Sequence, residues 1–274
     1  MKNAAPIKLE RSQFRSGVPV ASKEIAGIGR VLLWSGGSLW IGHSAGSGTA
    51  HAHHAIQISL ALSGRLRLRG NDDDEWVEYA GAIVLPHRRH RFDGGGESVA
   101  NIFVEPETTQ GRALLEQYTG APIIVLPGDT IERLVAPLRA AYAVGADDEV
   151  LIAASQRFVV LLCGSELSSL SVDPRITRAI EFVRSRLSTS VSLAQAAGVA
   201  HLSPSRFRHL FVAQTGVSFR AYVLWARVGS AVSAAMGGLS WTEAALNWGF
   251  ADSAHLSRTC RRMFGIAPTM LIRE

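Results

Sequence analysis

A chain of 274 residues, 47% of them hydrophobic and 19% charged, is long enough for two folded domains. No run of about 18 apolar residues suggests a membrane span, and no apolar N-terminal segment suggests a secretory signal. Cys163 and Cys260 lie far apart in helix-like patterns, which argues against a disulfide framework, so we expect a reducing, cytoplasmic location.

The net charge of +5 is distributed unevenly along the chain. Residues 175–274 contain 12 arginines, no lysine and four acidic residues, a net of +8, whereas residues 1–174 carry −3. Such a basic segment is typical of a domain that binds a polyphosphate, because each phosphate that it neutralises releases counterions. A generally basic protein is the alternative, and the sharp division disfavours it.

Residues 1–25 are mixed in character and predict an arm or edge strand. From about residue 26 to 105, short apolar runs between glycine-rich turns are typical of an all-β domain, with a hairpin tip at residues 71–74. Many short strands at this spacing predict a barrel or jelly roll. The predicted strands are Arg30–Trp34, Ser38–Ile41, Ala55–Leu62, Arg65–Arg69, Glu75–Tyr79, Ala82–Leu85 and Ala100–Val104.

The hydrophobic period then becomes helical, and it predicts helices over Gly111–Tyr118, Thr130–Val144 and Glu149–Leu170. The last of these is very apolar, which favours either a helix–helix or subunit interface or burial against its own β domain. We therefore expect a β domain over residues 1–110, a helical dimerisation segment over 111–170, a linker over 171–175 and a basic domain over 176–274. The fold class is multidomain α+β, with an all-α C-terminal domain.

The basic domain contains the same small unit twice. A shift of 49 positions places Phe207 on Leu256, Phe211 on Cys260 and Gly216 on Gly265. Each copy predicts a short helix, a tight turn and a second helix rich in arginine, which is the plan of a helix-turn-helix DNA reader. A long helix over residues 218–236 connects the two units.

Capping signals mark where these helices begin. Ser192-x-x-Gln195 and Ser240-x-x-Glu243 are capping boxes, with predicted turns at Gly198 and Gly249. Ser203 and Asp252 cap the two arginine-rich helices. Polar residues that can reach base edges or phosphates form the outward stripes of these helices. The predicted DNA-binding residues are Ser205, Arg206, Arg208, His209, Ser253, His255, Arg258, Arg261 and Arg262.

Residues 175–273 resemble the AraC/XylS family of bacterial transcription regulators. The most specific part is Gly249-Phe250, followed by Asp252-Ser-x-His255-Leu-Ser-Arg258 and Phe264-Gly265-x-x-Pro268. The resemblance implies that both arginine-rich helices enter successive major grooves about 34 Å apart. It also implies activation by contact with RNA polymerase. The two outward stripes differ, so the chain is expected to read an asymmetric promoter site.

The β segment resembles the cupin-like sensor domain common in the same family. His51-x-His53-x-x-x-Gln57 and His90 fit positions that hold a metal in metal-binding cupins, with Gln57 in place of the usual glutamate. Imidazoles suit zinc, nickel, copper or iron(II), so a divalent transition metal is one candidate ligand. An organic effector in the barrel and an empty barrel are the alternatives.

These patterns together predict an effector-responsive, sequence-specific DNA-binding regulator of the bacterial cytoplasm. It is expected to be a homodimer with no membrane contact and no catalytic residue. A metal-responsive regulator of the same family is the alternative. A cupin enzyme would not explain the basic repeat, and a constitutive DNA-binding protein would show no effector response.

Overall fold

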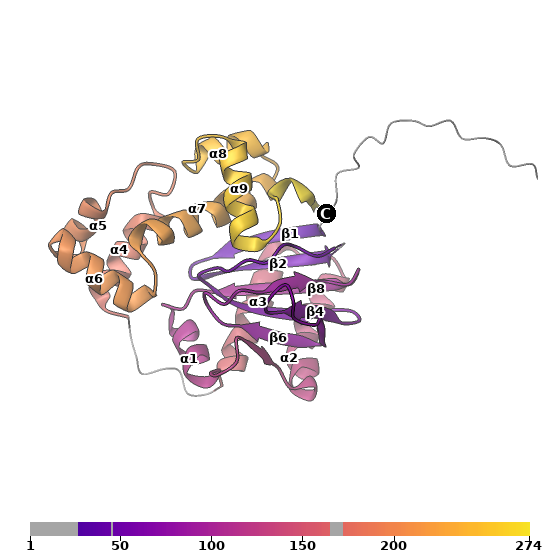
Figure 1. Cartoon of the computed structure of the whole chain (residues 1–274). Helices are drawn as coiled ribbons and strands as arrows, with labels where there is room; N and C mark the ends of the chain where they lie inside the picture. The colour runs from indigo at the N-terminus through magenta and orange to yellow at the C-terminus, as the bar shows by residue number, and fades with distance from the viewer. Residues whose placement is uncertain (1–26, 45, 165–171) are drawn as a thin grey trace, which may run out of the picture.

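The computed structural model describes residues 27–44, 46–164 and 172–274. A β-rich N-terminal part is built on one large sheet, and a group of helices from the C-terminal part lies against it (Figure 1). This confirms the multidomain α+β class. The predicted arm at residues 1–25 lies outside the described residues. Within the described ranges, no helix is both long and apolar enough to cross a membrane.

The large sheet has the strand order β10-β1-β2-β8-β3-β6-β9. Neighbouring strands are antiparallel except β1 and β10, which run parallel. The strands β9 and β10 were not predicted, because three residues are too few to show a period. The bounds are β1 Gly27–Trp34, β2 Gly37–Ser44, β3 Ile56–Ala61, β6 Gly81–Val84, β8 Ser98–Val104, β9 Ile123–Val125 and β10 Leu271–Arg273.

The pleat of the central strands gives the sheet two different faces. Ile58 and Ile102, paired across β3 and β8, point to a face covered by α2 (Gly128–Ala143) and α3 (Asp148–Cys163). Gln57 and Phe103 are the next pair in the register and therefore point to the opposite face. That opposite face holds the polar residues that matter below.

A small sheet with the order β5-β4-β7 covers one end of the opposite face. It consists of β4 (Leu66–Arg69), β5 (Val77–Tyr79) and β7 (Arg91–Asp93), and the leucines of β4 pack on Ala82 and Val99. The cupin-like two-sheet arrangement is confirmed, but the described strands form no closed barrel. The rest of this face is covered by C-terminal helices instead.

Among the described residues, three helices belong to the N-terminal part, and they largely confirm the predicted ones. Besides α2 and α3 there is α1 (Thr109–Gln117). The prediction for α3 ran to Leu170, but the helix ends at Cys163, because Gly164 takes a left-handed φ of 73°. Leu151 and Phe158 of α3 are buried against the large sheet, whereas Val160 and Leu161 are exposed.

The C-terminal helices are α4 (Pro174–Arg184), α5 (Leu193–Val199), α6 (Pro204–Thr215), α7 (Phe219–Met236), α8 (Trp241–Asn247) and α9 (Ser253–Phe264). Both predicted capping boxes are present, and Ser203 and Asp252 cap α6 and α9 as expected. The turn placed at Gly198 was wrong. Gly198 lies inside α5, and His201 makes the turn with φ of 53°.

The second half of the helical region docks on the opposite face of the large sheet. Val31 and Phe103 of the sheet share one core with Trp225 of α7 and Phe264 of α9. The ring centroids of Trp40 and Phe264 are 4.5 Å apart. These helices occupy the position where further strands would have closed a barrel, so the second recognition helix rests directly on the sensor sheet.

Candidate DNA interface and effector site

The first recognition helix, α6, separates an apolar face from a polar one. Phe207 and Phe211 are fully buried in a core that α4, α5 and α7 share. The outward residues Ser205, Arg206, Arg208 and His209 are all exposed. The predicted reading stripe of the first unit is therefore accessible from solvent.

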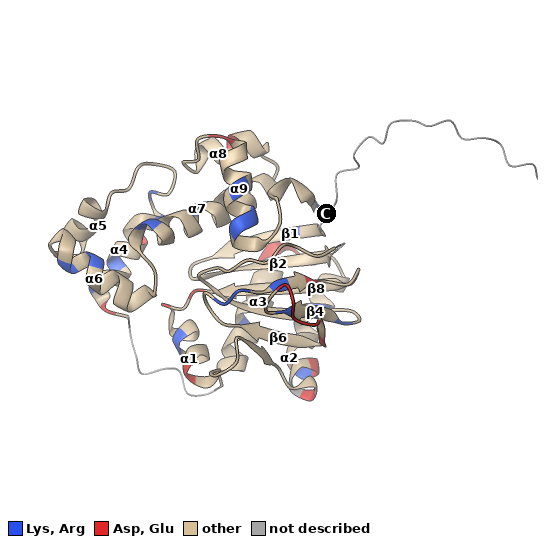
Figure 2. Ribbon diagram, in the orientation of Figure 1, with Lys and Arg blue, Asp and Glu red and all other residues tan. Residues whose placement is uncertain are grey.

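The second recognition helix, α9, repeats this plan with one difference. Leu256 and Cys260 are fully buried, and Arg258, Arg261 and Arg262 are exposed. Ser253 and His255 are half-buried, and the His255 ring packs edge-on against Phe250 at 5.2 Å. In Figure 2 the ribbons of both α6 and α9 contain stretches coloured blue for Lys and Arg. The three exposed arginines of α9 have no ion-pair partner among the described residues.

A single long helix connects the two units. With 18 residues, α7 is about 27 Å long, comparable to one turn of duplex DNA. Arg227 of α7 fixes it to the first unit, because its guanidinium donates to the carbonyl oxygens of Leu187 (3.0 Å) and Thr189 (2.6 Å). The arrangement suits two helices that enter successive major grooves.

Three buried imidazoles converge on the inner face of the sensor domain. His51, His53 and His90 each offer a nitrogen, and these nitrogens all lie within 4.8 Å of one another. Burial lowers the pKa of all three rings to about 3, so they are neutral at pH 7. Neutral imidazole is the form that binds a metal.

Backbone carbonyls set the orientation of these rings. The Nδ1 atoms of His51, His53 and His90 lie 3.0, 2.8 and 2.9 Å from the carbonyl oxygens of Thr49, Ala55 and Arg88. A carbonyl only accepts hydrogen bonds, so each Nδ1 carries the proton and each Nε2 presents a lone pair. A neighbouring carbonyl that fixes the tautomer in this way is typical of metal-ligating histidines.

Gln57 brings another lone pair to the same point. Its Oε1 lies 2.9 Å from His53 Nε2 and 3.2 Å from His90 Nε2. Its amide nitrogen faces away and donates to Ser59 Oγ at 2.8 Å and to Asn101 Oδ1 at 3.3 Å. Oxygen and imidazole lone pairs that face one another repel, and a cation between them would remove the repulsion.

A cavity of about 110 Å³ lies between this polar cluster and the docked helices. Its walls are mostly apolar and include Trp40, Phe103 and Phe264. His51, Gln57 and Asn101 supply polar groups at one side. A mainly apolar cavity with a few convergent polar groups is typical of a small-molecule site.

The histidine cluster touches the end of the second recognition helix. Thr49 N and Thr49 Oγ1 both donate to the carbonyl oxygen of Gly265, at 2.8 and 3.1 Å. Gly265 ends α9 with φ of 74°, and a Cβ built there would lie 2.6 Å from His51 Nδ1. The loop that carries His51 is thus in direct contact with α9.

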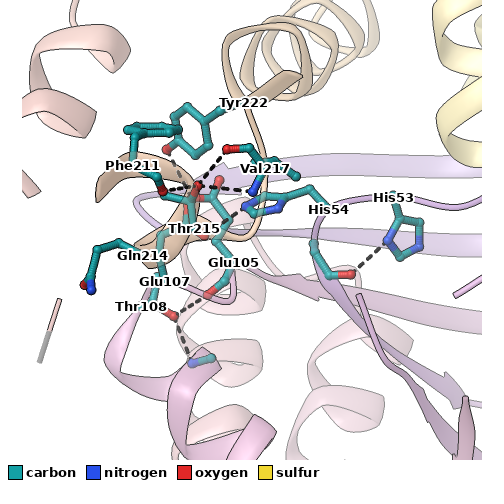
Figure 3. Close-up of polar contacts among 12 residues, drawn as sticks. His53, His54, Glu105, Glu107, Thr108, Phe211, Gln214, Thr215, Val217 and Tyr222 are labelled. Carbon is teal, nitrogen blue, oxygen red and sulfur yellow. Dashed lines mark hydrogen bonds and ion pairs between the residues drawn. The ribbon is translucent and has the colours of Figure 1, made fainter. Parts of the chain in front are cut away.

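A second polar cluster joins the sensor domain to the first unit (Figure 3). Glu105, just after β8, forms an ion pair with Arg184 of α4, and Arg184 Nε donates to the Tyr222 hydroxyl at 3.1 Å. Nearby, His54 Nε2 donates to Glu107 at 2.9 Å. Burial and the neighbouring Glu107 raise the pKa of Glu105 to about 7, although Arg184 opposes the shift.

Comparisons with known proteins agree with this geometry. The helix-turn-helix domain family matches residues 193–274. The probable transcriptional regulator LumQ of Photobacterium leiognathi is 25% identical over 233 residues, which cover 81% of this chain and 91% of that protein. Residues 193–274 thus form a helix-turn-helix domain, and the chain is similar to a probable transcriptional regulator over most of its length.

Solved structures support the fold of this chain over nearly its whole length. A structure of apo ToxT K231A from Vibrio cholerae has a TM-score of 0.56 at 12% identity and covers 87% of this chain and 97% of that one. A second ToxT structure has a TM-score of 0.52 at 15% identity, with 90% and 94% covered. At these identities the likeness concerns the fold.

The structure brings together the residues predicted for the effector site, His51, His53, Gln57 and His90, and it exposes most of the predicted reading stripe. Sequence reasoning missed Ser59 and Asn101, which hold the Gln57 amide, and the pair Glu105–Arg184. The acidic residues that directly follow an apolar strand were the available signal for Glu105. Nothing in the local sequence pointed to Arg184 as its partner.

Of the remaining histidines near the motif, His43 and His87 are exposed, and His54 forms a hydrogen bond with Glu107.

Proposed function

We propose that this regulator binds promoter DNA through α6 and α9, and that a small ligand beside α9 modulates the binding. The observation that carries the proposal is the contact between the cavity wall and the second recognition helix, through Thr49, His51 and Gly265. A ligand that changes the position of the His51 loop would bind one orientation of α9 better than another. Such differential affinity is what a population shift requires.

Base reading is assigned to the N-terminal half of each recognition helix. The proposed base readers are Ser205, Arg206, Arg208, His209, Ser253, His255 and Arg258. Arg261 and Arg262 are proposed as phosphate clamps, because they lie in the last turn of α9.

An organic effector is the first candidate ligand. Structures of ToxT have been solved with an unsaturated fatty acid and with (E)-4-(8-methylnaphthalen-1-yl)but-3-enoic acid. In the present chain the cavity is about 110 Å³, whereas an engineered protein cavity of about 150 Å³ holds benzene. The effector is therefore proposed to be a compact, mostly apolar molecule with one polar group that faces Gln57 and Asn101.

The organisation of the whole chain is proposed on the same basis. Residues 1–110 form the sensor, residues 111–170 the dimerisation segment, residues 171–175 the linker and residues 176–274 the DNA-binding domain. The exposed Val160 and Leu161 of α3 support a homodimer contact on that helix. From the resemblance to the AraC/XylS family we also propose that the protein contacts RNA polymerase, lies in the bacterial cytoplasm and has no enzymatic activity.

The DNA-binding proposal is tested by selecting binding sites from random duplexes with the full-length protein. Replacing Arg258 with alanine should relax specificity at one or two base pairs and weaken binding by about 1–3 kcal/mol. Arg133→Ala, an exposed arginine on α2, is the matched control. A selected motif that is identical for Arg258→Ala and the control would contradict the assigned role.

A metal-responsive regulator is the second candidate, and the lone pairs that face one another at Gln57 favour it. His51, His53 and His90 would each bind the metal through Nε2, with Gln57 Oε1 as a fourth ligand. Three imidazoles and one neutral oxygen suit zinc, nickel, copper or iron(II). The bound ion would supply charge that holds the His51 loop, and hence Gly265, in one position.

Elemental analysis of the purified protein and titration with zinc, nickel or cobalt test the metal proposal. One metal per chain is expected, and His51→Ala/His53→Ala should lose it. His43→Ala is the control, because His43 is exposed on β2. A wild-type protein that neither carries nor takes up metal would show instead that the Gln57 amide is rotated, so that its NH₂ group donates to the two rings.

A further inference from the structure

A hollow of about 600 Å³ lies between the sensor domain and the exposed side of α9. The sensor lines it with residues 49–52 and with Arg89. The recognition helix lines it with Arg258, Arg261 and Arg262. Two parts of the chain that are far apart in sequence thus place four guanidinium groups around one open space.

No acidic side chain lines this hollow among the described residues. His51 also lines the hollow, where its Nδ1 faces the carbonyl oxygen of Thr49. Arg89 is 59% exposed and contacts one acid, Asp72, at 3.2 Å. Asp72 also pairs with Arg69 and Arg91, so its single negative charge is shared among three arginines. The hollow is therefore suited to an anion.

The hollow is continuous with the predicted reading face, because Arg258 belongs to both. The DNA strand beside a recognition helix presents phosphates to the groups that flank the helix, and a planar guanidinium matches phosphate oxygens well. The hydrogen bonds from Thr49 to Gly265 and the Trp40–Phe264 contact hold Arg89 and α9 in one arrangement.

We propose that the sensor domain takes part in DNA binding, with Arg89 contacting a backbone phosphate beside the clamps Arg261 and Arg262. The second unit would then read DNA while it remains docked on the sensor. This inference rests on the proposed DNA-binding function. It adds a phosphate contact that the helix-turn-helix units alone would not make. It also places the DNA close to the ligand site, because His51 lines both the hollow and the cavity.

The salt dependence of binding to a mixed-sequence duplex, long enough for both units, tests the inference with the full-length protein. Each phosphate contact contributes about 0.9 to the slope of log K against log salt. Arg89→Gln should lower the slope by about that amount, equally for unrelated sequences. Asp72→Asn should have the opposite effect on affinity, because it removes the acid that competes for Arg89.

Two controls separate the possible failures. Arg133→Gln on α2 should leave the slope unchanged, and Arg262→Gln should lower it. If Arg262→Gln lowers the slope and Arg89→Gln behaves like Arg133→Gln, the sensor contact is wrong and the DNA-binding proposal stands. If neither arginine of the hollow affects the slope, the DNA-binding assignment of α9 also fails.

Two further outcomes would also overturn the sensor contact. Tighter DNA binding by Arg89→Gln would mean that the sensor obstructs the DNA. Saturable binding of inorganic pyrophosphate that Arg89→Gln abolishes, with an unchanged DNA slope, would assign the hollow to a small anion.

Discussion

Replacing Gly265 with alanine should weaken the contact between the second recognition helix and the sensor domain. Gly265 has a left-handed φ of 74°, which costs an alanine about 1–2 kcal/mol. The added Cβ would also clash with the carbonyl oxygen of Thr49 and lie 2.6 Å from His51 Nδ1. Overpacking of this kind costs about 1–3 kcal/mol, so a total loss of about 2–5 kcal/mol is expected.

Gly216 provides a matched control for this experiment. It ends α6 with φ of 76°, and the nearest atom to an added Cβ is His87 Nε2 at 3.8 Å. Gly216→Ala should therefore cost only the backbone strain of about 1–2 kcal/mol. Urea unfolding followed by tryptophan fluorescence measures both variants, and Trp40 and Trp225 lie at the docked surface. Equal losses of stability in the two variants would refute the reasoning, because they would show that the Thr49–His51 loop does not constrain α9.

Three other predictions concern the ligand site, the buried acid and the first unit. Gln57→Glu should raise metal affinity by about tenfold or more, since it adds an anionic ligand among neutral imidazoles, and an unchanged titration would contradict the site. Glu105 has a pKa of about 7 in the folded state, against an ordinary value of 4.5. Between pH 4.5 and 7 the folded state therefore binds more protons than the unfolded state. The contribution of Glu105 to the stability of the wild type falls as the pH rises through this range. The free energy of unfolding of Glu105→Gln relative to wild type should therefore increase by up to roughly 3 kcal/mol between pH 4.5 and 7, and a pH-independent difference would argue against the shift. Phe211→Ala should destabilise the first unit by about 3–5 kcal/mol in thermal unfolding, whereas the exposed Ala213→Ser should be near neutral.

The DNA-binding half was the easier half to predict, because its signals are local. Ser192, Ser240 and Asp252 are each within three or four residues of the groups that they cap, so the sequence shows both partners at once. Gly198 does not form the predicted turn. Glycine is the usual residue for a left-handed turn, but the short helix continued through it and His201 adopted that conformation instead.

The sensor half was harder to predict, because its structure depends on contacts between residues that are far apart in the sequence. Arg184 and Glu105 are 79 residues apart, and neither is unusual in its own neighbourhood. The predicted barrel stayed open because residues of α7 and α9 cover the sheet face that more strands would have covered. A helical pattern predicts that its apolar face is buried, but it does not say against which partner.

The pairing of β10 with β1 has a consequence for how the protein is made. Gly27 pairs with Leu271, so the edge of the sensor sheet is completed by residues that are synthesised only after the helices of the DNA-binding domain. Until then, β1 presents unpaired backbone groups and Val31 lacks its cover of Trp225, which are conditions that favour aggregation. The sensor therefore cannot finish folding before the DNA-binding domain is synthesised, and a nascent chain of this regulator should depend on chaperones until both halves have met.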